Sequence, residues 1–418
     1  MKGIIKISIQ IPVLPCKKGI LLLLLAGMMG NVVFATQIII SNPASFKREK
    51  EIISIKKTTL GKVKKGLFPI VKKGNKQLAT QIIDTDNDGK WDELLVEVSL
   101  SAHGADTLQL SWAAKEAVSK RYTNIRLSLR SDMDSPTPEI PYAIRKRGFV
   151  QNIAKPYYQI EGPGIENDKV AFRAFFDYRN SEDIYGKIVD TPILEKVGVG
   201  ASWHKLQPWG MDIFHTGNSL GAGGLAVEEN KQIYRLGDAD TSTFQVLYKG
   251  ALQAAFKLGF TNWDVAKGKK NGSETISMAK GNYYYKNDIA LALASKQKLI
   301  AGIANFGIDK VVYKKHNALF SSISTYGPQA EGTNTQLGVA IMFPSADYVG
   351  NMTADTASVI PNTSYVAMKH SQKKAIYFFA CWEKTDARFS AAEGFENYLA
   401  QTAERLANPI KIKIINSK

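Results

Sequence analysis

The chain has 418 residues, and its 54 lysines and arginines against 38 aspartates and glutamates give a formal net charge of +16. Its two cysteines exclude a fold that depends on several disulfides, whereas its length allows one large β domain or two ordinary domains with full cores. The basic charge favours an anionic partner such as an acidic polysaccharide. No recognised nucleic-acid motif is present, so we expect no nucleic acid partner. The alternative is that scattered lysines only keep the surface soluble.

Residues 1–35 predict a signal peptide. Two lysines precede the apolar run 19–26, and residues 33–35 (Val-Phe-Ala) have the small-x-small pattern of a signal-peptidase site. Because the run is short for a bilayer span, we expect export to the periplasm or cell surface without stable membrane insertion, rather than a membrane anchor. Cleavage would lower the formal charge to +12 and leave Cys381 as the only cysteine, which its apolar neighbours predict to be buried.

Residues 36–135 predict a small N-terminal β-sandwich of immunoglobulin-like type. Several short runs alternate between apolar and polar residues, as half-buried strands do, and turn residues separate them. These runs are 37–40, 67–71, 78–83, 93–100, 107–112 and 121–129. The polar, proline-containing segment 131–138 marks the boundary.

An Asp-rich hairpin lies inside this first domain. Its acidic residues occupy the first, third, fifth and ninth positions of a loop with Gly89 at the sixth, and they are Asp84, Asp86, Asp88 and Asp92. Hard oxygen ligands around a tight glycine turn are typical of a calcium loop. Position twelve is Leu95 rather than glutamate, so the loop is not an EF-hand. A structural Ca²⁺ site is therefore predicted, and a plain Asp-Gly turn without metal is the alternative.

Residues 136–418 predict a large antiparallel β-sandwich that carries the catalytic or binding site. Strand patterns recur at 245–248, 252–260 and 339–343, without a helical period between them. One helix is expected near the end, with Ser390 and Glu393 as a capping box. Residues 410–415 then alternate as a last strand.

The segment 170–180 concentrates charged and aromatic residues. On a strand, Arg173, Phe175 and Asp177 would share one face, and Tyr178, Arg179 and Asn180 follow directly. Guanidinium groups hold carboxylates in a two-pronged fashion, and aromatic rings stack on sugars, so the pattern favours an acidic-sugar site. The alternative is an Arg–Asp ladder on a solvent-facing strand.

A second cluster follows between residues 203 and 215. Two of the five histidines of the chain, His204 and His215, lie there beside Trp203, Trp209 and Asp212. A structural role is usual for a single histidine, but this clustering indicates a functional one. Neither HxH nor HExxH spacing occurs, so the sequence does not predict zinc. No motif of an organic cofactor is recognised.

These residues carry a resemblance to a bacterial family of domains of unknown function, numbered 4861. The similarity extends over nearly all of the chain after the signal peptide, including the Asp-rich hairpin. Its motifs are 167–173 (NDKVAFR), 176–180 (FDYRN), 183–187 (DIYGK), 203–205 (WHK), 209–212 (WGMD), 217–223 (GNSLGAG), 382–383 (WE) and 408–414 (NPIKIKI).

The resemblance implies an exported protein of polysaccharide-utilisation loci that processes uronic-acid oligosaccharides. Dehydration of a terminal uronate is one activity that it implies, and the implied fold is a mutarotase-like supersandwich, as in several lyases. The implied chemistry is β-elimination, in which a cation neutralises the carboxylate, a base removes the C5 proton and an acid protonates the group that leaves C4.

We expect Arg173 or Arg179 at the substrate carboxylate, His204 as the base and Tyr178 as the acid. Further substrate-binding residues are expected among the remaining members of both clusters and two reserve arginines, and these are Arg145, Arg147, Asp177, Asn180, Trp203, Trp209, Asp212 and His215. One alternative is a glycoside hydrolase that uses paired carboxylates from Asp177, Asp183 and Asp212. The other is a glycan-binding protein without catalysis.

Overall fold

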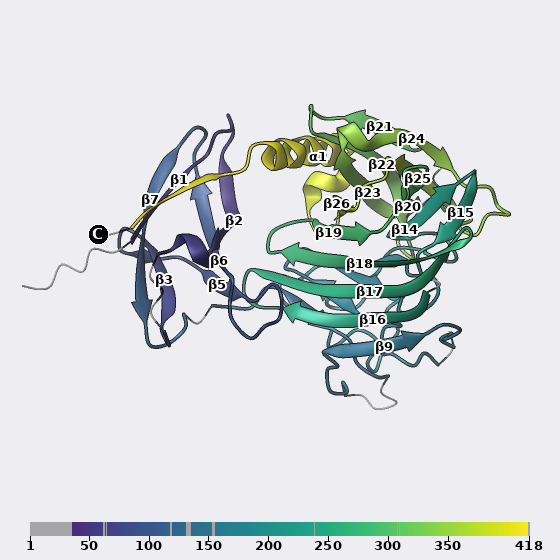
Figure 1. Cartoon of the computed structure of the whole chain (residues 1–418), viewed down its shortest axis with the longest axis horizontal. Helices are drawn as coiled ribbons and strands as arrows, with labels where there is room; N and C mark the ends of the chain where they lie inside the picture. The colour runs from purple at the N-terminus through teal and green to yellow at the C-terminus, as the bar shows by residue number, and fades with distance from the viewer. Residues whose placement is uncertain are drawn as a thin grey trace, which may run out of the picture. The chain divides into compact units, whose positions relative to one another are not determined.

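Antiparallel strands make up most of the protein, as the alternating residue patterns predict (Figure 1). The computed structural model describes residues 36–416 except for 62, 64, 118, 131–134, 153–154, 238, 307 and 309, so the predicted signal peptide lies outside the described residues. Within them, the expected mostly β fold with a single C-terminal α-helix is confirmed. None of the described helices has the length and apolar character needed to cross a bilayer.

Two sheets form a first sandwich. One has the strand order β27-β1-β7-β3-β4 and the other the order β2-β6-β5. Alternate strand residues such as Ile38, Val71 and Val96 are buried in its core. The strands are β1 (Thr36–Ser41), β2 (Arg48–Lys56), β3 (Phe68–Lys73), β4 (Lys76–Gln77), β5 (Thr80–Ile83), β6 (Glu93–Leu100), β7 (Ala105–Ala113) and β27 (Lys411–Ile415), and the 3₁₀ helix η1 (Lys57–Thr59) follows β2.

The last strand of the chain completes this first sandwich. β27 pairs antiparallel with β1, with Ile38 opposite Ile414. Arg48 adds a second link, because its buried guanidinium donates to the carbonyl oxygen of Asn408 and, at 3.1 Å, to Oδ1 of Asn42. Two pairings thus cross the predicted division at residue 135: β27 joins β1, and β8 (Asn124–Arg126) joins β10 of the larger part. The division itself stays a prediction.

Three further sheets build the larger part. A nine-stranded sheet has the order β21-β22-β23-β26-β19-β18-β17-β16-β9, and two five-stranded sheets have the orders β13-β12-β11-β10-β8 and β15-β14-β20-β25-β24. Its strands are β9 (Tyr142–Lys146), β10 (Gly164–Glu166), β11 (Val170–Ala174), β12 (Glu182–Lys187), β13 (Gly210–Asp212), β14 (Ala222–Glu229), β15 (Gln232–Arg235), β16 (Ala239–Tyr248), β17 (Gln253–Val265), β18 (Gly268–Ala279), β19 (Tyr284–Leu291), β20 (Lys298–Ala304), β21 (Val312–Lys315), β22 (Phe320–Ala330), β23 (Thr335–Pro344), β24 (Tyr348–Thr353), β25 (Thr363–Met368) and β26 (Lys373–Trp382).

One apolar core joins these three sheets. Phe172 of β11, Val227 of β14 and Phe256 of β17 belong to the same buried cluster. Apolar side chains from one face of each sheet fill this core, so every sheet has a second face that must meet either water or another segment. That second face of the β8–β13 sheet is where the charged residues gather.

The helix α1 (Ala392–Ala407) packs its apolar stripe on β26, and Cys381 is buried beneath it, as predicted. The predicted capping box is wrong. Ala391 is the N-cap and no side chain caps the helix, because the Ser390 hydroxyl donates to the carbonyl oxygen of Ala387 at 2.8 Å. Asp386 instead caps the short 3₁₀ helix η3 (Ala387–Ser390). Another 3₁₀ turn, η2 (Ser345–Asp347), precedes β24.

The β8–β13 sheet has one apolar and one charged face. Phe172 and Ile184 point into the core, whereas the cross-strand pair Arg173 and Asp183 lies on the opposite face. β11 ends at Ala174, so the predicted strand through Tyr178 is too long. The segment between β12 and β13 covers the charged face, since its Leu194 and Val197 form an apolar cluster with Ala171. The charged side chains are therefore shielded from water, and they need partners within the protein.

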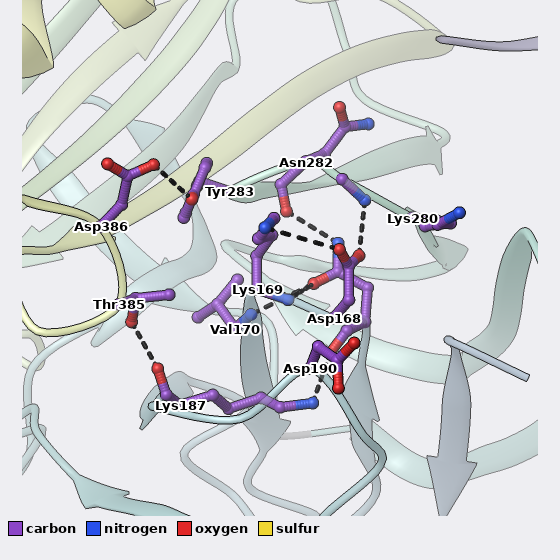
Figure 2. A network of polar contacts seen from close by, with 12 residues as sticks. Asp168, Lys169, Val170, Lys187, Asp190, Lys280, Asn282, Tyr283, Thr385 and Asp386 are labelled. Atoms are coloured by element: carbon purple, nitrogen blue, oxygen red, sulfur yellow. Dashed lines mark hydrogen bonds and ion pairs between the residues drawn. The ribbon is translucent and has the colours of Figure 1, made fainter. Parts of the chain in front are cut away.

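Lys187 and Glu166 show how this need is met. Both side chains are 0% exposed, and the Lys187 ammonium lies 2.8 Å from the Glu166 carboxylate. That carboxylate also accepts the backbone N–H groups of Ile193 and Leu194, which holds the covering segment on the sheet. The Thr385 hydroxyl donates to the carbonyl oxygen of Lys187 at 2.7 Å, and this bond ties the turn after β26 to β12 (Figure 2).

Glu182 is a buried carboxyl group that lacks such partners. It neighbours Asp183 on β12 and points to the apolar side, where neither carboxyl oxygen has a hydrogen-bond partner among the described residues. Burial and then the nearby Glu274 raise its pKa well above the ordinary 4.5. The folded protein thus holds a proton at pH values where the unfolded chain has released it.

This difference predicts a loss of stability as the pH rises above 4.5. In that window the folded state binds more protons than the unfolded state, so the free energy of unfolding falls by up to about 1.4 kcal/mol per pH unit through this group. In a Glu182→Gln variant this part of the decline should be absent. Urea titrations of both proteins from pH 4 to 9 measure it, and parallel curves would contradict the assignment.

Candidate functional site

Three adjacent strands bring the central ions of the charged face together. Arg173 of β11 is 2% exposed, and its guanidinium contacts the Asp183 carboxylate of β12. The same guanidinium lies 3.6 Å from Oδ2 of Asp212 on β13 and 3.6 Å from Oε1 of Glu161. Because β11 and β13 both flank β12, the register places Arg173 opposite Asp183 and puts Asp212 opposite Tyr185 on the same face, whereas Glu161 joins from the segment before β10.

A second guanidinium extends this cluster. Arg179 lies 2.6 Å from Asp177 and 2.9 Å from Glu161, and its guanidinium stacks on the Phe175 ring at 3.7 Å. Arg173 lies over the same ring at 4.2 Å. Four carboxyl groups thus face two guanidinium groups, and these six residues, the acidic cluster below, are Glu161, Asp177, Asp183, Asp212, Arg173 and Arg179.

Burial is the main influence on the protonation of this cluster. It raises the pKa of Asp212 well above its usual range, the neighbouring Asp183 adds to this, and Arg173 opposes it. Burial also raises the pKa of Asp183, against the attraction of Arg173. Burial by itself would lower the pKa of Arg173, but Tyr185 and the surrounding carboxyl groups raise it above the ordinary value. Asp212 and Asp183 therefore hold a proton more tightly than ordinary carboxyl groups do.

His204 stands at the border between this cluster and water. Its side chain is 59% exposed, and its Nδ1 lies 3.9 Å from Oδ2 of the buried Asp212. The backbone N–H of Asp212 donates to the carbonyl oxygen of Trp203 at 2.8 Å, which holds the Trp203-His204 turn against β13. The predicted proximity of Trp203, His204 and Asp212 is therefore observed. The sequence reasoning did not anticipate that the carboxylate is buried behind the imidazole.

Glu331 joins the site from the turn between β22 and β23, and the sequence reasoning missed it. Its backbone N–H donates to the carbonyl oxygen of Ile213 at 2.9 Å, and its carboxylate lies 3.3 Å from Nδ1 of His215. A Cβ on the next residue, Gly332, would come within 2.9 Å of the Met211 side chain, so the turn approaches β13 closely. The only local signal is a polar Glu-Gly turn.

Three of these residues have the arrangement of a metal site. One ligand atom from each of His204, Asp212 and Glu331 lies within 4.8 Å of the others. One imidazole nitrogen and two carboxylate oxygens are suitable donors for a divalent cation. Arg173 already lies 3.6 Å from Asp212 and competes for the same charge.

Tyr178 lies on a neighbouring cavity of about 700 Å³. Its side chain is exposed, and its hydroxyl lies 3.3 Å from Oδ1 of Asn218. Asn218 follows His215 in one short loop, in which a Cβ on Gly217 would meet the ring of Phe306 and Nε2 of His215. The loop from His215 to Asn218 thus connects the cavity with the His204 site.

The other predicted residues do not join this site. Arg145 is buried and donates to the carbonyl oxygen of Gly237 and to Ser242, and Arg147 pairs with Asp240 and Asp264. The remaining two have structural contacts: the Asn180 amide donates to the buried Glu274 at 2.9 Å, and the Trp209 ring packs on Tyr185. Arg145, Arg147 and Asn180 thus bind other groups of the protein, and Trp209 packs in an apolar cluster.

The Asp-rich loop follows β5 and is separate from this site. Ligand atoms of Asp84, Asp86 and Asp88 lie within 4.8 Å of one another. Asp84 accepts backbone N–H groups, including that of Gly89 at 2.8 Å, and Asp88 lies 3.0 Å from the ammonium of Lys90. Asp92 accepts the N–H and hydroxyl of Thr85 and does not belong to this group of close ligand atoms. Three close carboxylates, of which Asp86 and Asp88 are exposed and Asp84 is half-buried, fit a hard cation such as Ca²⁺.

The model of a family described as a domain of unknown function (DUF4861) matches residues 40–412. The chain belongs to this family. The match spans both the first sandwich and the larger part, and it confirms the resemblance that the sequence motifs carried. A curated relative, uncharacterized protein P7 of Formosa agariphila, is 20% identical over 344 residues, which are 81% of this chain and 82% of that protein.

Two solved structures of Enterococcus faecalis proteins are also similar to this member of the family. They are an α-mannosidase from strain V583, with a TM-score of 0.48, and a protein in the glycosyl hydrolase family 38, with a TM-score of 0.49. Each is 9% identical to this chain, and each alignment covers 92% of this chain. The alignments cover only 46% of the α-mannosidase and 48% of the family 38 protein. The chain thus spans about half the length of these two structures.

Calcium binding by the Asp-rich loop stays a prediction. Saturating Ca²⁺, at 100 times the dissociation constant, should stabilise the folded protein by about 2.7 kcal/mol, which is a rise of a few degrees in Tm. EDTA should reverse this rise. An Asp86→Asn variant, which changes only one weakly bonded carboxylate, should lose most of it. Calorimetry measures the shift, and a Tm that Ca²⁺ leaves unchanged would contradict the prediction.

Proposed function

We propose that the protein is an exported carbohydrate-active enzyme that acts on uronic-acid-containing oligosaccharides by β-elimination. The observation that carries the proposal is the half-exposed His204 backed by the buried Asp212, whose carboxylate lies 3.9 Å away. A histidine between water and an acidic cluster is suited to accept a proton from a substrate. The basic net charge of the chain supports an acidic substrate.

The reaction starts at the proposed base. In the proposed step His204 takes the C5 proton and becomes an imidazolium, which lies beside the Asp212 carboxyl group at 3.9 Å. The electrons of the C5–H bond form the C4=C5 double bond, and the C4–O bond breaks. The leaving oxygen takes a proton from Tyr178 and departs as water or as the next sugar.

Arg173 and Arg179 have a positioning role in this proposal. Both guanidinium groups are engaged by carboxylates of the protein itself, and Arg173 is almost fully buried. They hold Asp183, Asp212 and Glu161 in place and limit the repulsion among them. The cation that neutralises the substrate carboxylate has to come from elsewhere in the site.

Replacement of His204 tests the base. A His204→Ala variant should lose about 100-fold or more of kcat, the usual contribution of a general base. His370→Ala, at an exposed position far along the chain, is the matched control and should keep full activity. The assay follows ultraviolet absorbance and mass of uronate-terminated oligosaccharides, in which dehydration removes the mass of one water. Full activity of His204→Ala would remove the assignment.

A Tyr178→Phe variant tests the acid. It keeps the ring but removes the hydroxyl, so kcat should fall by about 100-fold while KM changes little. Steady-state kinetics separate the two constants. Release of saturated sugar without new ultraviolet absorbance would instead indicate a hydrolase, and oligosaccharide of unchanged mass would indicate a binding protein.

A further inference from the structure

The cavity beside Tyr178 is lined by Arg235, a charged residue that has no role in the proposed reaction so far. Three segments and Asp264 of β17 line it, and the segments are the turn after β11, the loop before β14 together with β15, and the segment before β25. The residues that matter here are Tyr178, Asn218, Tyr234, Arg235, Ser358 and Val359. Its volume of about 700 Å³ is within the range of small-ligand sites.

Arg235 links the segments that line this cavity. Its Nε donates to the carbonyl oxygen of Arg179 at 2.7 Å, and its Nη1 donates to the carbonyl oxygens of Asn218 at 2.9 Å and Val359 at 3.2 Å. Its Nη2 donates to the carbonyl oxygen of Ser219. These bonds fasten the three segments to one another. They use four of the five guanidinium N–H groups, which leaves one N–H of Nη2 for a ligand.

Arg235 forms no close ion pair with the described residues. All four acceptors are neutral backbone carbonyls, and no carboxylate oxygen among the described residues lies within 4.0 Å of the guanidinium, although Asp177 and Glu182 attract it from a greater distance. Arg173 and Arg179, in contrast, are each paired with carboxylates. Asp264 also lines the cavity, but Lys269 at 2.7 Å and Arg147 at 2.8 Å neutralise it.

Burial makes this unpaired charge significant. Arg235 is 9% exposed, and desolvation lowers its pKa to about 10, so the group is still charged at neutral pH. A buried charge that lacks a partner keeps an unsatisfied attraction for an anion. The exposed side chain of Tyr178 belongs to a residue that lines the same cavity, and aromatic rings offer apolar faces on which sugars stack.

We propose that this cavity binds the carboxylate-bearing sugar of the glycan, with Arg235 as its positive charge and Tyr178 as its aromatic wall. The inference rests on the proposed function, in which Tyr178 acts on the same sugar. It supplies the cation that neutralises the uronate carboxylate, which neither Arg173 nor Arg179 is free to provide. The ligand class is thus a uronic acid rather than a neutral hexose.

An isosteric substitution at residue 218 tests the role of the positive charge of Arg235 and leaves the hydrogen bonds of Arg235 intact. Asn218→Asp adds a carboxylate beside the guanidinium, whose bond to residue 218 uses only the backbone carbonyl. It should weaken binding of a glucuronate-terminated disaccharide about tenfold at low salt, because one like charge costs on the order of 1 kcal/mol near a surface. Binding of the glucose-terminated counterpart should not change. Asn75→Asp, an equal charge change on an exposed turn of the first sandwich, should affect neither.

Titration calorimetry in a His204→Ala background measures binding without turnover by the proposed base. A Tyr178→Ala variant should weaken binding of both sugars, since the aromatic wall does not distinguish their charge. Equal affinity for the two sugars, or an effect of Asn218→Asp no larger than that of Asn75→Asp, would overturn the inference.

The outcomes separate this inference from the proposed function. If no oligosaccharide loses the mass of water but the uronate preference and its Asn218→Asp sensitivity hold, the cavity assignment stands and β-elimination falls. If elimination occurs while Asn218→Asp leaves uronate binding unchanged, β-elimination stands and the role of Arg235 falls.

Discussion

The contact of Arg173 with Asp183 is the constraint on which the site depends. The two residues are directly opposite on β11 and β12 and are shielded from water. Neither charge could be buried without the other, since an unpaired buried charge costs several kcal/mol. Asp212 on β13 and Glu161 each lie 3.6 Å from the Arg173 guanidinium of this pair. The segment between β12 and β13 then covers the charged face of the sheet.

This arrangement also explains how the charged face of the β8–β13 sheet can be buried. A sheet with one wet face needs no ion pairs there, and surface pairs contribute little to stability. Here the covering segment excludes water, so each ion must be satisfied by the protein. The same exclusion of water strengthens the electrostatic effect of the cluster on a group at its border. His204 is such a group, because it is exposed while Asp212 behind it is 1% exposed.

Residue alternation and short sequence separation account for what could be predicted. Alternation placed Arg173 opposite the apolar Phe172, and closeness in sequence joined Trp203 and His204 to Asp212. Glu331 and Arg235 were missed because tertiary pairing alone brings them to the site, and neither belongs to a recognisable motif. The burial of the arginines could not be predicted either. The sequence pattern suggested that Arg173 and Arg179 are open to a substrate, but both are paired with carboxylates of the protein. The Ser390 cap failed for a local reason, since its hydroxyl bonds within the preceding turn.

The pairing of β27 with β1 has a consequence for the order in which the protein folds. The sheet of the first sandwich pairs residue 37 with residue 415, which is far away in the sequence. Closing so long a loop is slow, and until β27 forms, β1 has no hydrogen-bonded neighbour on that side. β1 therefore gains this neighbour only after all the strands between β1 and β27 have been synthesised.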